Sequence, residues 1–264
     1  MIVDCFIFYN ELELLEYRLN IMNDLVDFFI LVEATNTFIG EKKELFYENN
    51  KDKFKKFHNK IIHIIVDDMP IKEKLNVNRS VWNNEIFQRN CIKRGLEKLQ
   101  LKDNSIILLS DVDEIIDPIK LTEFIPKIDT IYSVWMDLYW YNLNRIHKGT
   151  IWGKFKICRY CDIKDQTIEN IRNKGCPVIS KKSSGWHLSY FGDVEFIHNK
   201  LSNFAHQESA VQDINNKEEI LKRMNNGDDL YVRNRGWKFT YISKDENNYL
   251  PPMYEKYLSK FINM

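Results

Sequence analysis

Two aspartates one residue apart, Asp111 and Asp113, are the side chains best placed for chemistry in this 264-residue chain. They follow the apolar segment 105–109. Alternate residues of an extended segment point to the same side unless the backbone turns between them. Two carboxylates so placed can hold a hard divalent cation such as Mg²⁺ or Mn²⁺, together with phosphate oxygens. The same pattern fits a solvated turn at the end of a strand, with Glu114 as a solvated neighbour.

A third interpretation is a phosphatase of the haloacid-dehalogenase type, in which the first aspartate of a D-x-D motif is the nucleophile. In such enzymes the motif opens the domain, and Thr or Val stands two residues after the second aspartate. Here 110 residues precede the motif, and that position is Ile115. Both departures weigh against the phosphatase.

The elements that would position these carboxylates are predicted by alternating patterns in the first half. Short apolar segments at 2–9, 27–34, 60–66 and 105–109 are typical of strands, and segments 12–22, 42–58 and 80–101 are typical of helices. Near-continuous apolar strands separated by helices predict a parallel sheet that is buried on both faces. Ligands bind at the carboxyl ends of the strands in such sheets.

Three further polar side chains follow predicted strands, and we expect them at the same edge of the sheet: Asn10, Glu11 and Glu33. Asn10 is equally well explained as a helix cap, because Glu13 stands three residues later in a capping-box pattern. Arg89, on the helix before the fourth strand, can grip phosphate or sugar oxygens with its guanidinium. Alternatively it forms an exposed pair with Glu85 one helical turn away.

The second half of the chain is less regular. Segments 131–143 and 152–159 predict long antiparallel strands, and 186–191 predicts another strand. A helix is expected from Asp193, and a short closing helix from 251 to 262. No linker or repeat divides the sequence, so we expect one domain over 1–264, with a nucleotide-sugar-binding half at 1–115 and an acceptor-binding half at 116–264.

Composition excludes several classes of protein. Lys plus Arg total 38, as do Asp plus Glu, so the formal net charge is zero. This balance argues against nucleic acid as a partner, which requires an excess of basic residues. The N-terminus lacks the features of a signal peptide, and no apolar run approaches the roughly 20 residues that span a bilayer. We therefore expect a cytoplasmic protein.

Six segments together resemble glycosyltransferase family 17, which includes the enzyme that adds bisecting GlcNAc to N-glycans. They are residues 4–20, 26–40, 87–96, 108–115, 185–192 and 200–208. The resemblance runs from about residue 3 to residue 262. It implies an α/β fold of the glycosyltransferase-A type, with a Rossmann-like, mostly parallel sheet and a smaller antiparallel region on the acceptor side. It also implies inverting transfer of GlcNAc from UDP-GlcNAc to a glycan hydroxyl, with Mn²⁺ or Mg²⁺ as cofactor.

The resemblance assigns roles to the residues already singled out. Asp113 becomes the direct metal ligand, and Asp111 contacts the ribose, or the metal through water. Asn10, Glu11 and Glu33 line the uridine pocket, and Arg89 contacts the donor.

Further roles follow in the second half. Glu195 is the expected general base, and Asp193 is the second candidate unless it caps the helix. Trp186 is expected to stack on an acceptor sugar, with core packing as the alternative. His187 and His206 are candidates for an additional metal or phosphate contact, and Glu208 for an acceptor contact. A non-catalytic glycan-binding module on the same fold remains the alternative to an enzyme, and would bind glycans without affinity for UDP.

Overall fold

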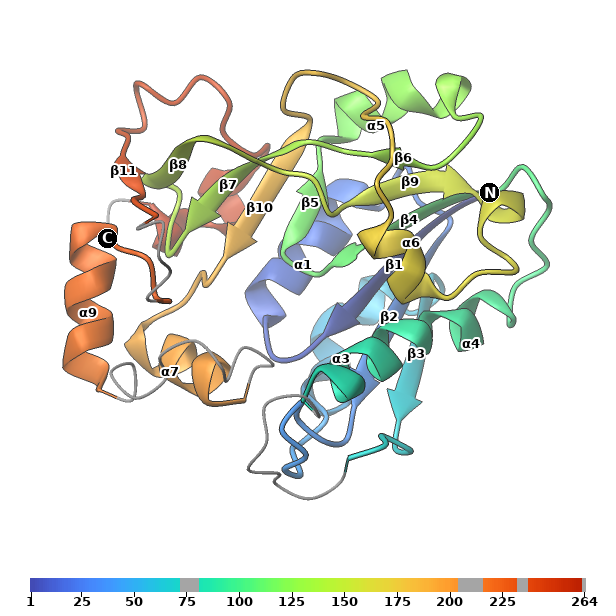
Figure 1. Cartoon of the computed structure of the whole chain (residues 1–264), viewed down its shortest axis with the longest axis horizontal. Coiled ribbons are helices and arrows are strands. Elements are labelled where there is room, and N and C mark those ends of the chain that lie inside the picture. The colour runs from blue at the N-terminus through green and yellow to red at the C-terminus, as the bar shows by residue number, and fades with distance from the viewer. Residues whose placement is uncertain (72–80, 204–215, 232–236, 263–264) are drawn as a thin grey trace.

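Two sheets and the helices around them make up the computed structural model, which describes residues 1–71, 81–203, 216–231 and 237–262 (Figure 1). The chain is therefore of the mixed α/β class, as the sequence predicts. The first sheet has the strand order β3-β2-β1-β4-β9-β6, and the second has the order β11-β8-β7-β10-β5.

The first sheet has a parallel core of four strands, whose apolar sequences make them strands buried on both sides. These are β1 (Ile2–Phe8), β2 (Phe28–Ala34), β3 (Ile61–Val66) and β4 (Ile106–Asp111). Two antiparallel strands, β9 (Lys156–Arg159) and β6 (Tyr132–Ser133), extend the sheet beyond β4. Because β6 and β9 come from the second half of the sequence, the two halves share this sheet.

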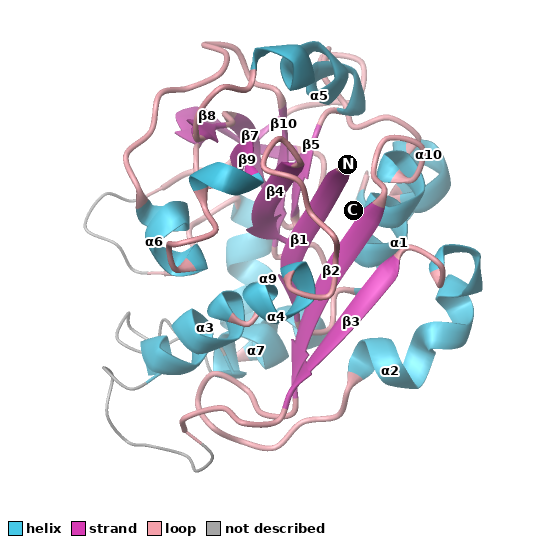
Figure 2. Cartoon of the chain, turned by 90° about the vertical axis from the view of Figure 1, so that its right-hand side faces the viewer, coloured by secondary structure: helices cyan, strands magenta, loops and turns pink. Residues whose placement is uncertain are grey.

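Helices cover both faces of the first sheet (Figure 2). One face packs on α1 (Leu12–Met22), α2 (Phe46–Asn50) and α5 (Pro118–Phe124), and the other on α3 (Val81–Asn90), α4 (Ile92–Leu96) and α6 (Ile168–Asn173). In strand β1, alternate side chains point to opposite faces of the sheet and pack in different hydrophobic clusters. Phe6 and Phe8 enter one hydrophobic cluster, and Cys5 and Ile7 enter the other.

The second sheet carries most of the remaining chain. Its strands are β5 (Glu114–Ile116), β7 (Met136–Trp140), β8 (Arg145–Trp152), β10 (Gly185–Ser189) and β11 (Thr240–Tyr241). Neighbouring strands pair antiparallel, except that β10 and β7 are parallel. The helices of this half are α7 (Val194–Asn203), α9 (Lys217–Asn226) and α10 (Tyr254–Tyr257). Short 3₁₀ segments lie at Lys51–Phe57, Ile125–Lys127, Tyr160–Asp162 and Ser259–Phe261.

Helix α1 packs between the two sheets. Leu15 and Leu19 belong to the core of the first sheet, whereas Leu14 and Tyr17 pack in a cluster with Trp186 and other side chains of the second. Strand β5 begins three residues after β4 ends, so the chain passes from one sheet to the other through the segment that holds Asp111 and Asp113. This motif therefore lies at the junction of the sheets.

A close approach of two strands fixes the other side of this junction. Gly185 on β10 lies so near β5 that an added Cβ would be 2.4 Å from the carbonyl oxygen of Ile115. The glycine allows β10 to pair with β5, and this register sets His187 opposite Glu114. The backbone N–H of Leu188 also donates to the carbonyl oxygen of Asp113, at 2.8 Å. His187 is thereby brought beside the motif.

The structure departs from the predicted elements in the second half. The single strand expected over 131–143 is two strands, β6 and β7, that belong to different sheets. Segment 152–159 likewise divides, because Trp152 ends β8 and Lys156 begins β9. Continuous hydrophobicity predicts that a segment is buried, but it does not reveal a crossing between two sheets.

The expected capping box at the start of α1 is also wrong. Glu11 is the N-cap residue and makes no side-chain capping bond; its carboxylate instead accepts hydrogen bonds from the backbone N–H groups of Tyr9 and Asn10, at 3.3 and 3.0 Å. No helix in the described part of the chain is long and apolar enough to cross a membrane.

Candidate functional site

A pocket of about 1080 Å³, counting the part open to solvent, lies where the carboxyl ends of the parallel strands meet the second sheet. Four of the residues selected from the sequence line it: Glu11, Asp111, Asp113 and His187. Its other polar lining includes Asn36, Thr37, Lys43, Glu85, Gln88, Ser189, Lys200 and Asn203. Its aromatic lining includes Phe8, Tyr9, Phe38, Trp140, Trp152, Tyr190, Tyr231 and Trp237.

Asp113 is nearly buried on the wall of this pocket, with 8% of its side chain exposed. One carboxylate oxygen is 3.6 Å from His187 Nε2, and the other is 3.5 Å from Lys200 Nζ. Burial by itself would raise the pKa of Asp113, but Lys200 and His187 outweigh it and hold the pKa well below the ordinary aspartate value. Asp113 is therefore a carboxylate at neutral pH.

Lys200 ties the helix α7 to the strand ends. Its ammonium lies 2.8 Å from the Glu11 carboxylate, in addition to its longer contact with Asp113. Although burial opposes the charged form, these two carboxylates raise the pKa of Lys200 above its ordinary value. The pocket thus contains a permanent cation between two carboxylates.

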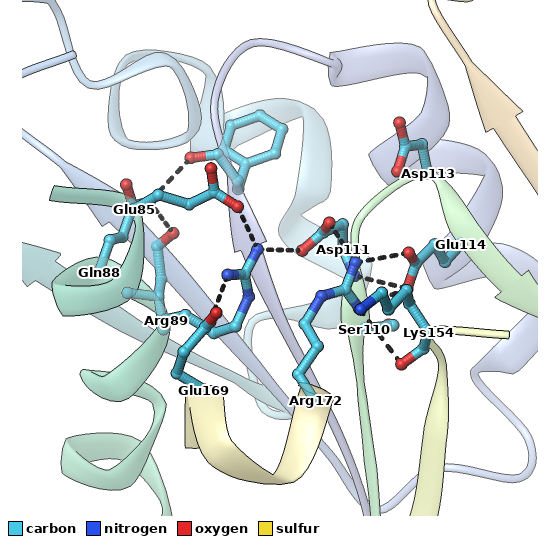
Figure 3. A network of polar contacts seen from close by, with 12 residues as sticks. Glu85, Gln88, Arg89, Ser110, Asp111, Asp113, Glu114, Lys154, Glu169 and Arg172 are labelled. Atoms are coloured by element: carbon cyan, nitrogen blue, oxygen red, sulfur yellow. Dashed lines mark hydrogen bonds and ion pairs between the residues drawn. The ribbon is translucent and has the colours of Figure 1, made fainter. Parts of the chain in front are cut away.

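Asp111 faces a different environment from Asp113, although the two are one residue apart (Figure 3). Its two carboxylate oxygens accept hydrogen bonds from two buried guanidiniums, Arg89 at 3.2 Å and Arg172 at 2.6 Å. Burial raises the pKa of Asp111, but Arg172 and Arg89 lower it by more. Figure 3 shows Asp113 turned away from both arginines. Both aspartates therefore line the pocket, but Asp111 is held by two guanidiniums, whereas Asp113 has longer contacts with His187 and Lys200.

We give the name arginine network to Arg89, Asp111, Glu114, Glu169 and Arg172; the two arginines and Glu114 are buried, and the other two are partly exposed. Arg172 makes two bonds to the Glu114 carboxylate, at 2.6 and 2.9 Å, and Arg89 is 2.7 Å from Glu169. Trp152 adds a bond from its indole N–H to Glu114, also at 2.6 Å. The expectation that Glu114 is a solvated neighbour is wrong, because this residue is fully buried and its charge is matched by Arg172.

Backbone contacts to Arg18 hold the same turn from the side of α1. Its guanidinium donates to the carbonyl oxygens of Asp111, Val112 and Glu114, at 2.9, 3.3 and 2.7 Å. Arg18 is itself buried and paired with Asp4 on β1. The turn after β4 is therefore fixed by hydrogen bonds to its main chain as well as to its side chains.

Arg89 forms the predicted pair with Glu85, at 2.7 Å, but the pair is buried rather than exposed. Arg89 does not line the pocket. Glu33 is fully buried below the pocket, where it contacts His63 Nε2 at 3.1 Å, accepts from the backbone N–H of Tyr47 at 3.0 Å, and lies 3.8 Å from Lys43 Nζ. Glu33 therefore reaches the pocket only through Lys43, which lies on the wall.

The structure does not bring the remaining described candidates to the pocket. Asn10 lies beside Glu11 but is not part of the lining. Glu195 is 70% exposed and pairs with Lys217 at 2.6 Å. Asp193 accepts a hydrogen bond from the backbone N–H of Phe196, at 2.8 Å, which is the capping role considered as its alternative.

Trp186 is 1% exposed and packs in the core, where its indole N–H donates to the carbonyl oxygen of Tyr249 at 2.9 Å. It thus occupies the core position considered as its alternative, and its neighbour His187 takes the pocket side of β10. His206 and Glu208 lie outside the described residues.

The sequence did not single out Lys200, Arg172 or Trp152. Arg172 and Asp111 are 61 residues apart in the chain, and Lys200 and Asp113 are 87 apart. Lys200 begins the segment 200–208 that carries part of the family resemblance, but no pattern links any of the three residues to its partner, because each pairing depends on how the second half folds back on the first. One signal was available for Lys200: it lies within the amphipathic segment between Ile197 and Leu201, on a face that is buried in the structure.

The side chains that could ligate a metal ion here would leave part of its coordination shell open. Within the described ranges, no group of three or more His, Cys, Asp or Glu side chains is arranged to hold a metal ion. Asp113 and His187 are two adjacent ligand candidates on the pocket wall, and His187 Nδ1 is buried with no hydrogen-bond partner among the described residues. Such a pair suits a cation whose remaining ligands are waters and substrate phosphates.

A comparison with models of known protein families found a match over a range that contains this site. The model of the family described as glycosyltransferase family 17 matches residues 1–243. The matched range includes the motif after β4 and the pocket residues His187 and Lys200. No curated protein matches the chain.

Proposed function

The chain belongs to glycosyltransferase family 17, and we propose that it is an inverting enzyme that moves GlcNAc from UDP-GlcNAc to a glycan hydroxyl with a β linkage. The observation that carries the proposal is the placement of Asp111 and Asp113 at the carboxyl end of β4, on the wall of the pocket. Parallel sheets bind ligands at this edge. We propose the glycosyltransferase-A type for the fold on the same grounds.

We propose that the uridine and ribose occupy the part of the pocket formed by the first half. The loop after β2 contributes Asn36 and Thr37 there, and Gln88 from α3 also lines it. Asp111 supplies a carboxylate whose two oxygens are oriented by Arg89 and Arg172. An ionised carboxylate held in this way is a good acceptor for ribose hydroxyls.

We propose Mn²⁺ or Mg²⁺ as the cofactor, held by Asp113 and His187. The bound cation would offset the negative charge that develops on the leaving UDP. Asp111 is less suited to direct coordination, because both its oxygens already accept from guanidiniums. The roles expected for Asp111, a contact with the ribose or with the metal through water, are compatible with these bonds, and we propose them for it.

The other end of the pocket is aromatic, and we propose that it receives the transferred sugar and the acceptor. Trp152, Tyr190 and Trp237 come from the second half and line this end. The ring of Trp152 lies over His187, with the centroids 4.3 Å apart, so it is fixed beside the proposed metal ligand. Flat aromatic faces pack well against the C–H faces of sugars, and this platform takes the place expected for Trp186.

The general base is the role with the least support from the geometry. Inverting transfer needs a group within hydrogen-bond reach of the acceptor hydroxyl. Glu195 and Asp193 do not line the pocket, and Glu195 is exposed on α7; we propose either of them as the base only if α7 moves toward the acceptor during the reaction.

The phosphatase alternative finds no support in the geometry. A nucleophilic aspartate attacks phosphorus through a carboxylate oxygen, and the charge-assisted bonds from Arg89 and Arg172 to both oxygens of Asp111 make it a weaker nucleophile. A non-catalytic glycan-binding module differs from an enzyme in releasing no UDP.

The direct test is UDP release from a panel of UDP-sugars, in the presence of Mn²⁺ and a panel of glycan acceptors. We expect release from UDP-GlcNAc that depends on an acceptor and is lost with the Asp113→Asn variant. Arg159→Gln is a matched control, because Arg159 forms its ion pair with Asp162 away from the pocket. Glycan binding without UDP binding would identify a binding module and overturn the proposal.

A further inference from the structure

Lys200 is a buried cation on the pocket wall, and the proposed binding of the UDP-sugar and of the metal ion gives it no role. Its side chain is 11% exposed, and its ammonium lies between the carboxylates of Glu11 and Asp113. The ammonium is also 5.4 Å from the centre of the Tyr190 ring. A lysine is rarely buried unless it is paired, so its place in the fold is determined by this site.

The two contacts of Lys200 differ in a way that bears on its role. The distance to Glu11 is 2.8 Å, a short charge-assisted bond. The distance to Asp113 is 3.5 Å, at the limit of a hydrogen bond, and His187 is 3.6 Å from the other oxygen of that carboxylate. Glu11 therefore anchors the ammonium, while its contact with Asp113 is loose enough to be exchanged for a ligand.

The charges around the pocket indicate which ligand that is. The negative charge of Asp111 is already balanced by its ion pairs with Arg89 and Arg172. Glu11 and Asp113 place two carboxylates on the wall, and Lys200 is the permanent cation in contact with both. A nucleoside diphosphate that enters here brings further negative charge, so a cation must face it. Charges at such distances in a poorly solvated site interact strongly.

We infer that Lys200 is a catalytic residue whose ammonium contacts the diphosphate of a nucleotide-sugar donor, and that it shares Asp113 with the divalent cation. This inference rests on the proposed function. As the bond between the sugar C1 and the diphosphate oxygen breaks, the electron pair stays on that oxygen, where the ammonium stabilises it. The acceptor oxygen forms the new bond to C1, and its proton passes to the general base.

Two consequences of opposite sign follow from this arrangement. Removing the positive charge should weaken the binding of UDP, because the diphosphate loses a partner. The same change should strengthen the binding of Mn²⁺ alone, because Asp113 loses a competing cation. A residue that only stabilises the fold would not shift these two affinities in opposite directions.

The experiment is calorimetric titration of UDP, UMP and uridine into wild type and Lys200→Gln, with EDTA present, and a separate titration with Mn²⁺ alone. We expect Lys200→Gln to weaken UDP binding by about tenfold or more, to change uridine binding by less than about twofold, and to tighten Mn²⁺ binding. Lys156→Gln is the matched control, because Lys156 is also buried and bonds to Ser133 away from the pocket.

A second variant keeps the test decisive if Lys200→Gln does not fold. Glu11→Gln is isosteric and frees the ammonium from its nearest partner, so we expect it to tighten UDP binding by about threefold. Unchanged or weaker UDP binding by Glu11→Gln, or wild-type UDP binding by folded Lys200→Gln, would overturn the inference. If wild type itself binds no UDP with or without Mn²⁺, the proposed function fails, and this outcome is distinct from the other two.

Discussion

The two aspartates of the motif after β4 belong to regions that differ in how their charges are satisfied. In the arginine network, Asp111 and Glu114 each bond to Arg172 at 2.6 Å, and Arg89 closes the set from α3. On the pocket wall, the contacts of Asp113 are 3.5 and 3.6 Å long, and Nδ1 of His187 has no hydrogen-bond partner within the part of the chain that the structure describes. The carboxylates of the network have short contacts to guanidiniums, although Arg89 Nε is buried with no hydrogen-bond partner among the described residues, whereas the longer contacts of Asp113 leave bonding capacity for a ligand.

This difference shows how one short motif can serve both positioning and binding. The network and Arg18 fix the turn, so the direction of Asp113 does not depend on contacts made within the pocket. A metal or diphosphate can then replace the loose contacts of Asp113 without disturbing the turn. Preorganisation of this kind is what catalytic sites require. Substitutions on the wall should therefore affect activity, and substitutions in the network should affect stability.

The largest effect is expected at the wall. Asp113→Asn should lower the rate of UDP release from UDP-GlcNAc by on the order of 100- to 1000-fold, because the variant loses the carboxylate proposed to hold the metal. Steady-state kinetics measure this loss, and circular dichroism checks that the variant is folded. Activity within about threefold of wild type would remove Asp113 from the metal site.

The network should respond mainly in stability. Arg172→Met leaves the carboxylates of Asp111 and Glu114 without their shared partner, so we expect the free energy of unfolding to fall by about 3 kcal/mol. Urea denaturation measures the change, and Arg172→Lys should recover part of it because it restores the charge. If Arg172→Met is as stable as wild type, the network does not hold the turn.

The pH dependence of stability gives a smaller test of the wall. The pKa of Asp113 is lower in the folded chain than in the unfolded chain, so its stabilising contribution is present above about pH 4 and is lost as the pH falls. Wild type should therefore exceed Asp113→Asn in stability near neutral pH by on the order of 1 kcal/mol, with the two converging in strong acid. Parallel stability curves over that range would contradict the ion pairing of Asp113.

Trp152 links the two regions, because its indole bonds to Glu114 and its ring lies over His187. Trp152→Phe keeps an aromatic ring but removes the hydrogen bond, and should cost about 1 kcal/mol of stability. Denaturation monitored by circular dichroism measures it. A loss as large as that of Arg172→Met would place Trp152 within the network rather than at its edge.

The smallest effect is expected outside both regions. Glu195→Gln changes an exposed side chain that pairs with Lys217, so we expect turnover to stay within about twofold of wild type. Steady-state measurements of turnover and of KM check this expectation. If turnover instead falls by about 100-fold or more, Glu195 gains support as the general base, and α7 must move during the reaction.

The sequence predicted the four parallel strands of the first sheet, because each is a short apolar segment buried on both faces, but it did not place β9 and β6 in that sheet. The polar residues that follow these strands were predicted to lie together at the carboxyl edge of the sheet. Glu11, Asp111 and Asp113 do line the same pocket. Arg172 could not be found in this way, since its partner is 61 residues away and its helix has no distinctive pattern. The sequence offered both Trp186 and His187 as candidates, but which of these two neighbours on β10 faces the pocket depends on the pairing of that strand.

The central claim, that the wall around Asp113 binds the diphosphate of a UDP-sugar, is tested most directly by calorimetric titration of UDP with Mn²⁺ present into wild type, Asp113→Asn and the control Arg159→Gln. We predict that wild type and Arg159→Gln bind UDP with equal affinity, while Asp113→Asn binds it at least about tenfold more weakly. Equal binding of UDP by all three proteins, or none by wild type, would contradict the claim.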